Sequence, residues 1–181
     1  MRIITPIFIV LIISIFSYSL YKQIKKDLKI QRVSCQEKTV TFEKIYHHPK
    51  TKLAIELLKS NNYTLQSHIE YSQHMKSKLI DILTIDEANT QLHDTIASYV
   101  FKEKPNKDRL IIDYYIYEND KKDLGKKQEN SKKYAGYLVF EFKLNNTLLY
   151  KIQSDYMKLD ASDIPERMNC IIQSFISLKD E

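Results

Sequence analysis

The pattern of apolar and polar positions divides the chain into an apolar first segment, a part with helical periodicity and a part with strand periodicity. The first segment, Ile3–Leu20, carries no charged side chain. At 1.5 Å per helical residue it covers about 27 Å, close to the thickness of the hydrocarbon core of a bilayer. It has no polar face, so a buried helix of a soluble core does not explain it. The pattern therefore predicts a membrane-associated segment.

Two interpretations of this segment remain. In a cleaved signal peptide, Arg2 is the basic start and Ser17 and Ser19 form an imperfect small-x-small cleavage site. In an uncleaved anchor, the segment is a transmembrane helix with Tyr18 and Tyr21 at the interface. Serine suits a cleavage site less well than alanine, and the apolar run is long for a signal peptide. The anchor is the favoured interpretation.

Helical periodicity follows in three stretches. Pro49–Lys59 has proline at the start of an apolar-rich stretch. Thr64–Leu83 has apolar residues at near-helical spacing, namely Leu65, Ile69, Met75, Leu79, Ile82 and Leu83. Thr84–Glu87 is a capping-box sequence that predicts the start of a third helix. A last helix is expected after Ser162, where a cap residue and an early proline occur together.

Strand periodicity marks the part between residues 109 and 156. Arg109–Glu118, Tyr134–Lys143 and Thr147–Tyr156 alternate with period two, and Asn145-Asn146 is a plausible tight hairpin turn between the last two. Thr39–Glu43 is ambiguous and could be a short strand. The expected fold class is α+β: an N-terminal membrane helix, a helical half, a three-stranded antiparallel meander, and a C-terminal helix packed on the sheet.

This order of elements predicts three regions. Residues 1–21 form the signal anchor, residues 22–37 a basic juxtamembrane segment, and residues 38–181 a single α+β domain. The last region is long enough to bury a substantial core.

The positive charge of the chain is confined to its first residues. The formal net charge is +5, and six of the 28 basic residues but one of the 23 acidic residues lie in residues 1–32. The part from 33 to 181 therefore has a formal charge of zero, which does not favour a nucleic-acid partner. The basic residues after the apolar run are expected at the membrane surface, where each binds anionic headgroups with about 1 kcal/mol. They are Lys22, Lys25, Lys26, Lys29 and Arg32.

The chain has two cysteines, Cys35 and Cys170. On a helical wheel Cys170 lies about 140° from the centre of the apolar stripe of its helix. A disulfide with Cys35 would explain that position, although two free thiols remain an alternative. A disulfide indicates an oxidising compartment and therefore export.

The two signals for topology conflict. The basic flank favours a cytoplasmic domain by the positive-inside rule, whereas the expected disulfide favours the periplasm. The expected location is the inner membrane of a bacterium, single-pass, with the domain in the periplasm. A soluble periplasmic form after signal cleavage and a cytoplasmic domain are the alternatives.

Motifs for catalysis, cofactors or metals are not recognised. With two glycines, the chain has no Gly-rich phosphate loop. Its five histidines form no HExxH sequence, and His93-Asp94 has no nucleophile elbow to complete a triad. No catalytic residue, cofactor or metal ligand is predicted.

Tyrosines are concentrated in the predicted strands, and tyrosine suits binding surfaces because it is large, rigid and amphipathic. Tyr115, Tyr117 and Tyr137 are the candidate partner-binding residues. The favoured function is protein–protein binding without catalysis, of the inhibitor, immunity or envelope-assembly type. A periplasmic hydrolase with an unrecognised site and a cytoplasm-facing membrane-tethered adaptor are the alternatives.

Overall fold

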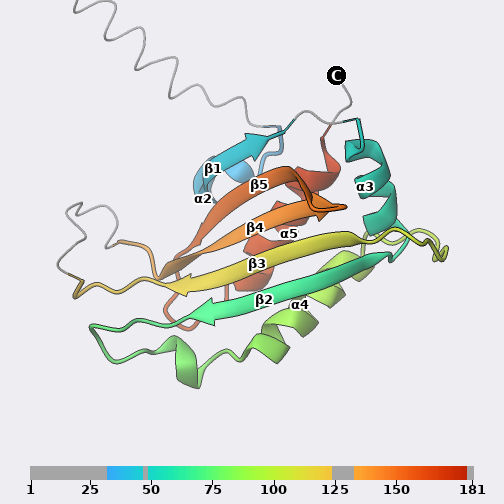
Figure 1. Cartoon of the computed structure of the whole chain (residues 1–181). Coiled ribbons are helices and arrows are strands. Elements are labelled where there is room, and N and C mark those ends of the chain that lie inside the picture. The colour runs from blue at the N-terminus through green and yellow to red at the C-terminus, as the bar shows by residue number, and fades with distance from the viewer. Residues whose placement is uncertain (1–31, 47–48, 124–132, 179–181) are drawn as a thin grey trace, which may run out of the picture. The chain divides into compact units, whose positions relative to one another are not determined.

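The computed structural model describes residues 32–46, 49–123 and 133–178 (Figure 1). Ile3–Leu20 and the four lysines between residues 22 and 29 lie outside these ranges. Within them, no helix is long and apolar enough to cross a membrane. The described fold begins at Arg32, and the residues from there onwards belong to one compact unit.

The described residues form an α+β fold around a five-stranded mixed sheet with the order β1-β5-β4-β3-β2. The strands are β1 (Val40–Ile45), β2 (Tyr63–Glu70), β3 (Leu110–Glu118), β4 (Gly136–Leu144) and β5 (Thr147–Tyr156). The predicted meander is present as β3, β4 and β5, but the prediction of a three-stranded, purely antiparallel sheet was wrong. Strand β1 adds antiparallel to β5, and β2 adds parallel to β3.

The error at β2 has a definite cause. Leu65 and Ile69 are four residues apart, a spacing that fits both one face of a helix and one face of a strand. In the structure they alternate with exposed polar residues, and β2 pairs in register with β3 from Tyr63↔Leu110 onwards. That pairing joins segments more than forty residues apart, so local periodicity could not reveal it. The expected helix over Thr64–Leu83 is this strand, a loop and the short 3₁₀ helix η1 (Leu79–Asp81).

The longer helices pack on one side of the sheet. Helices α4 (Ile85–Ala97) and α5 (Ile164–Ile176) lie behind the strands in Figure 1, and α3 (Thr51–Lys59) lies at the end where β2 begins. The short α2 (Gln36–Thr39) precedes β1. The core between α5 and the sheet is aromatic, with the rings of Phe142 and Phe175 stacked 4.0 Å apart.

Two local sequence signals are confirmed. Helix α4 starts at the predicted capping box: the Thr84 hydroxyl accepts the backbone N–H of Glu87, and the Glu87 carboxylate accepts that of Thr84. The β4–β5 hairpin turns at Asn145 and Asn146, whose φ values of 49° and 62° are the left-handed conformation that asparagine tolerates.

Gly136 marks a close approach between three strands. It pairs with Glu118 of β3 and with Tyr156 of β5. A Cβ atom at this position would overlap the carbonyl oxygen of Tyr117 and the ring of Tyr156. One of the obstacles is backbone, so a rotamer change cannot relieve the overlap.

Gly136→Ala should therefore lower the free energy of unfolding by about 1–3 kcal/mol or more, as overpacking does. Thr64→Ala, at an exposed position of β2, is the control and should change it by less than about 1 kcal/mol. Urea denaturation of both variants measures the difference. Equal stability of Gly136→Ala and the parent protein would show that the three strands are not this close.

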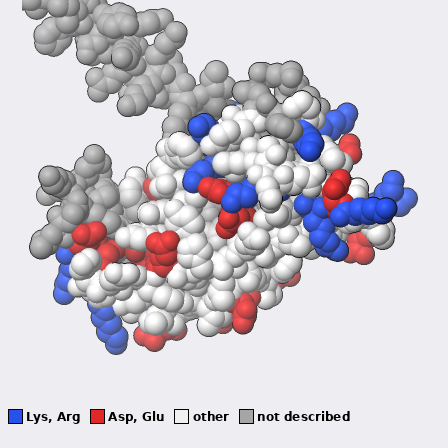
Figure 2. Space-filling model, viewed as in Figure 1, with Lys and Arg blue, Asp and Glu red and all other residues white. Residues whose placement is uncertain are grey.

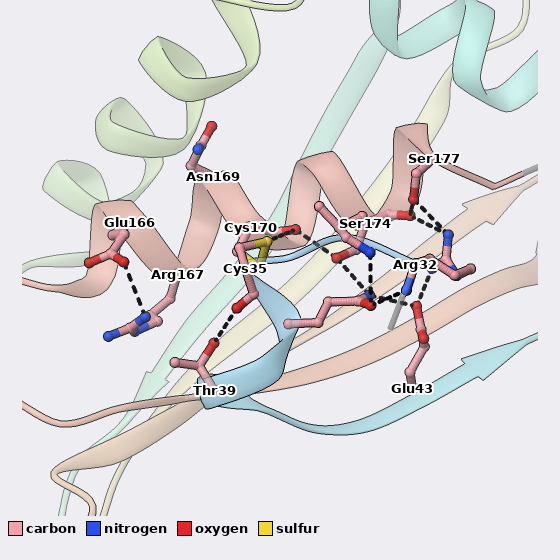
Figure 3. The surroundings of a disulfide bond; sticks show 12 residues. Arg32, Cys35, Thr39, Glu43, Glu166, Arg167, Asn169, Cys170, Ser174 and Ser177 are labelled. Carbon is pink, nitrogen blue, oxygen red and sulfur yellow. Dashed lines mark hydrogen bonds and ion pairs between the residues drawn. A yellow bond between two sulfur atoms is a disulfide. The ribbon is translucent and has the colours of Figure 1, made fainter. Parts of the chain in front are cut away.

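The predicted disulfide is confirmed by the geometry. Cys35, just before α2, and Cys170, in α5, are bonded with their Cα atoms 5.7 Å apart, although 135 residues separate them in sequence (Figure 3). Cys170 is 2% exposed because its side of α5 faces the segment around α2. The bridge therefore ties the first described residues to the last helix.

Arg32 strengthens the same connection. Its guanidinium donates to the carbonyl oxygen of Ser174 at 3.0 Å and to the hydroxyl of Ser177 at 2.7 Å, and it forms an ion pair with Glu43 (Figure 3). The side chain is 20% exposed. Tyr150 donates to Glu43, and burial together with this carboxylate raises the pKa of Tyr150. Arg32, expected at the membrane surface, thus directs its charge into the domain.

Cys170→Ser should abolish the faster migration of the non-reduced full chain on a denaturing gel and lower its stability by about 2–5 kcal/mol. Cys35→Ser should have the same two effects, and the double variant should lose no more than either single variant. If the single variants differed strongly in stability or kept the faster migration, the bridge would not be the bond that joins these segments.

Candidate functional site

The face of the sheet opposite α4 and α5 is not covered by any helix among the described residues (Figure 1). Figure 2 shows this open face from the same side, with a group of mixed charges over one part and uncharged side chains over another. The outward-pointing residues of β3 and β4 form its centre. They are Ile111, Asp113, Tyr115, Tyr117, Tyr137, Val139, Glu141 and Lys143. The open face has two chemically different halves.

One half is filled by ion pairs between neighbouring strands. The ammonium group of Lys143 lies 2.7 Å from a carboxylate oxygen of Asp113 and 2.7 Å from one of Glu141. Lys151 of β5 adds a contact of 2.6 Å to Glu141. Hydrogen bonds from Lys143 and Lys151 lower the pKa of Glu141. The charges of this half therefore satisfy one another, and partly exposed pairs of this kind contribute little to stability.

The other half is an aromatic cluster of four rings, His68, Tyr115, Tyr117 and Tyr137. Tyr117 and Tyr137 are opposite each other in the sheet and stack at 4.7 Å. Tyr115 meets Tyr137 edge to face at 6.3 Å, and His68 stacks on Tyr115 at 5.3 Å. Offset and edge contacts of this kind stabilise a sheet surface. The result is a continuous ring surface across β2, β3 and β4.

The structure thus brings the three predicted tyrosines together, and each ring is partly exposed. The sequence interpretation missed His68, whose side chain is 57% exposed, because its strand was expected to be a helix. The period-two alternation between Tyr63 and Tyr71 was the signal that could have placed His68 on this face.

The electrostatics of the cluster favour the protonated form of two of its hydroxyl groups, those of Tyr115 and Tyr137. Burial, the neighbouring Tyr115 and Tyr117, and the carboxylates of Glu70 and Asp155 raise the pKa of Tyr137 to about 12. Burial and Glu70 also raise the pKa of Tyr115. Near neutral pH these side chains are therefore hydrogen-bond donors on rigid rings rather than phenolate nucleophiles. This chemistry suits binding.

A hollow of about 630 Å³ adjoins the cluster, beyond the carboxyl ends of the parallel strands β2 and β3. Tyr117 belongs to both the cluster and the hollow. The lining residues are Ile69, Glu70, Tyr71, Ser72, Gln73, His74, Tyr117, Asp120 and Asp123. A side chain of a bound partner would have space here next to the rings.

A buried carboxylate holds one wall of this hollow in place. Glu118, at the end of β3 and 4% exposed, accepts the backbone N–H groups of Ser72 at 3.1 Å, Lys78 at 2.8 Å and Leu79 at 3.2 Å. Burial pushes its pKa up, but these hydrogen bonds and one from Ser77 outweigh burial and leave the pKa below its usual value. The charged form of Glu118 is therefore the one that fixes the loop after β2.

Asp120 acts in the same way two residues later. Its carboxylate accepts the backbone N–H groups of Gln73, at 2.9 Å, and of His74. Burial again opposes the shift, yet the hydrogen bonds lower the pKa of Asp120. Sequence reasoning missed both carboxylates, because their partners come from a loop about forty residues earlier in the chain.

A second hollow, of about 390 Å³, lies beside α4. Here the Tyr63 hydroxyl and Nδ1 of His93 are 2.6 Å apart, and burial raises the pKa of Tyr63. Asp94 also lines this hollow, but the lining includes neither a serine nor a cysteine that a triad would need. Within the described ranges, no group of three His, Cys, Asp or Glu side chains could hold a metal ion.

Known proteins give no guide to the role of these features. No protein-family model matches the chain, and neither a curated protein nor a solved structure matches it. The assignment of the site therefore rests on its geometry.

The low pKa of Glu118 predicts a pH dependence of stability. A group whose pKa is lower in the folded state stabilises that state above its unfolded pKa, about 4.3, and loses this contribution as pH falls through the folded pKa. Glu118→Gln should lower the free energy of unfolding at pH 7 by about 1–3 kcal/mol and flatten its decline below pH 5.

Glu166→Gln is the matched control, because that side chain is 74% exposed on α5. Its effect should stay within about 0.5 kcal/mol at both pH values. Urea denaturation at pH 7 and pH 4 measures both variants. A parallel pH dependence of Glu118→Gln and the parent protein would contradict the assigned role.

Proposed function

We propose that this chain is a membrane-anchored, exported domain that acts by binding another protein through the open face of its sheet. The observation that carries the proposal is the aromatic cluster, a row of four rings, each in contact with the next, on the face that no described helix covers. Aromatic residues, tyrosine among them, are enriched at protein interfaces and among the residues that dominate binding energy.

The open face has a suitable size for such a contact. Five strands at about 4.8 Å spacing and about 26 Å length present roughly 600 Å². A standard stable interface buries about 800 Å² per partner. The face together with the loops at its edge is therefore large enough for one partner.

Support for the location comes from two features. The disulfide between Cys35 and Cys170 favours an oxidising compartment, because such bonds are rare in reducing cytosol. The uncharged run Ile3–Leu20 favours an anchor in the inner membrane. The basic residues after this run oppose export by the positive-inside rule. That rule is a bias that depends on the basic residues in all segments flanking a membrane span, and it is not absolute. An inhibitor, an immunity protein and an envelope-assembly factor each fit this proposal.

The proposal predicts which face contacts a partner in the cell. A photo-crosslinking amino acid placed at Tyr137 or Tyr115 of the full chain should give one discrete adduct in intact cells of the native host. The same amino acid at Glu166, exposed on α5, should give none. The adduct at Tyr137 should disappear when Tyr115 and Tyr117 are both replaced by serine, while the variant keeps its thermal unfolding transition.

Adducts of equal yield from the sheet face and from α5 would contradict a binding site on the open face. So would adducts that consist of lipid alone, because the proposed partner is a protein. Mass spectrometry of the adduct separates these outcomes.

A further inference from the structure

The charges around the aromatic cluster are distributed unevenly. Beside the hollow, acidic side chains predominate: Glu70, Asp120 and Asp123 line it, and Asp155 is paired in register with Tyr137. The lysines of the open face are in the other half, where Lys143 and Lys151 pair with its carboxylates. Among the lining residues, His74 alone can carry a positive charge.

The acidic charge at this end is maintained by the fold. The carboxylates of Glu118 and Asp120 accept backbone N–H groups, and both have lowered pKa values, so they stay ionised at neutral pH. The carboxylate of Glu70 is at the open edge, with its side chain 48% exposed and 3.2 Å from His68. A ligand at the open edge therefore meets the half-exposed carboxylate of Glu70, next to buried carboxylates that are already ionised.

The rings supply the second element of recognition. Tyr117 and Tyr137 stack side by side, and Tyr117 is also part of the wall of the hollow. An aromatic face attracts a cation within about 6 Å, and a guanidinium can also stack on the ring and donate to a neighbouring carboxylate. An acidic ligand would be repelled by the carboxylate of Glu70 at the open edge, and a purely apolar ligand would gain no attraction from it.

We infer that the partner presents a basic segment to this end of the open face, with an arginine or lysine side chain against Tyr117 and Tyr137 and directed towards Glu70 and the hollow. The inference rests on the proposed function, because it specifies the partner of the same face. It is carried by the combination of ring surface, hollow and acidic wall, since the carboxylates alone would not define a site.

The test uses the full chain in uncharged detergent micelles, with its tyrosine rings labelled by carbon-13 for NMR. The probes are acetyl-(Gly-Arg)₃-amide, the same peptide with citrulline in place of arginine, and the same peptide with glutamate. The arginine peptide should bind at least ten-fold more tightly than the citrulline peptide and shift the ring signals of Tyr117 and Tyr137. The glutamate peptide should not bind.

Two variants localise the effect. Glu70→Gln should weaken binding of the arginine peptide about five-fold, and because this residue is exposed on an edge strand its replacement should leave the fold intact. Tyr137→Leu should weaken binding as well and keeps an apolar side chain at the position. Glu166→Gln is the matched control and should bind like the parent chain.

Several results would overturn the inference. These are equal binding of the arginine and citrulline peptides, shifts confined to other tyrosines such as Tyr63, or no effect of Glu70→Gln. A further control replaces two of the chain's own lysines, Lys126→Gln and Lys127→Gln, without added peptide. If this replacement shifted the ring signals of Tyr117 and Tyr137, the inference would also be overturned, because the chain's own lysines would then be the ligand. If face-specific crosslinks persist after any of these results, the proposed function stands without the basic partner; if the crosslinks are absent too, both fail.

Discussion

The packing of both long helices on a single face of the sheet is the constraint from which the other features follow. The inner face buries its aromatic residues against α5, where Phe142 stacks on Phe175 and also meets Tyr150. This burial supplies the apolar area that stabilises the fold. The outer face is therefore not needed for the core, and its side chains are available for ion pairs in one half and for exposed rings in the other.

The same inner face explains how the two ends of the domain are joined. Cys170 is on the side of α5 that faces α2, and it is bonded to Cys35. Arg32 reaches the last turns of α5 through Ser174 and Ser177 and pairs with Glu43 of β1. A covalent bond and a partly buried charge network thus hold the start of the domain against its last helix. The open face is on the other side of the sheet and takes no part in this connection.

The sequence predicted the features that local patterns determine. The alternation of β3 placed Tyr115 and Tyr117 on one face, the two asparagines gave the hairpin, and the capping box gave the start of α4. The disulfide between Cys35 and Cys170 could be predicted from the position of Cys170 on a helical wheel and from the presence of two cysteines in the chain. In each case the information lies within a few residues or in the chemistry of one residue type.

What the sequence did not predict depends on contacts between distant segments. The parallel pairing of β2 with β3 turned an expected helix into an edge strand, and with it His68 joined the cluster. The hollow exists because Glu118 and Asp120 bind backbone groups of a loop about forty residues earlier. Hydrogen bonds of this kind leave no periodic signal in the sequence.

The central claim, that the open face contacts a protein in the cell, is tested most directly by hydroxyl-radical footprinting of the full chain. The oxidation rates of Tyr115, Tyr117 and Tyr137 are compared between native membranes and the purified chain in detergent. The account predicts that these tyrosines are oxidised at least three-fold more slowly in the membranes, whereas Phe101, which is 82% exposed and outside the open face, is oxidised at the same rate in both. Equal rates for the three tyrosines in the two preparations would contradict it.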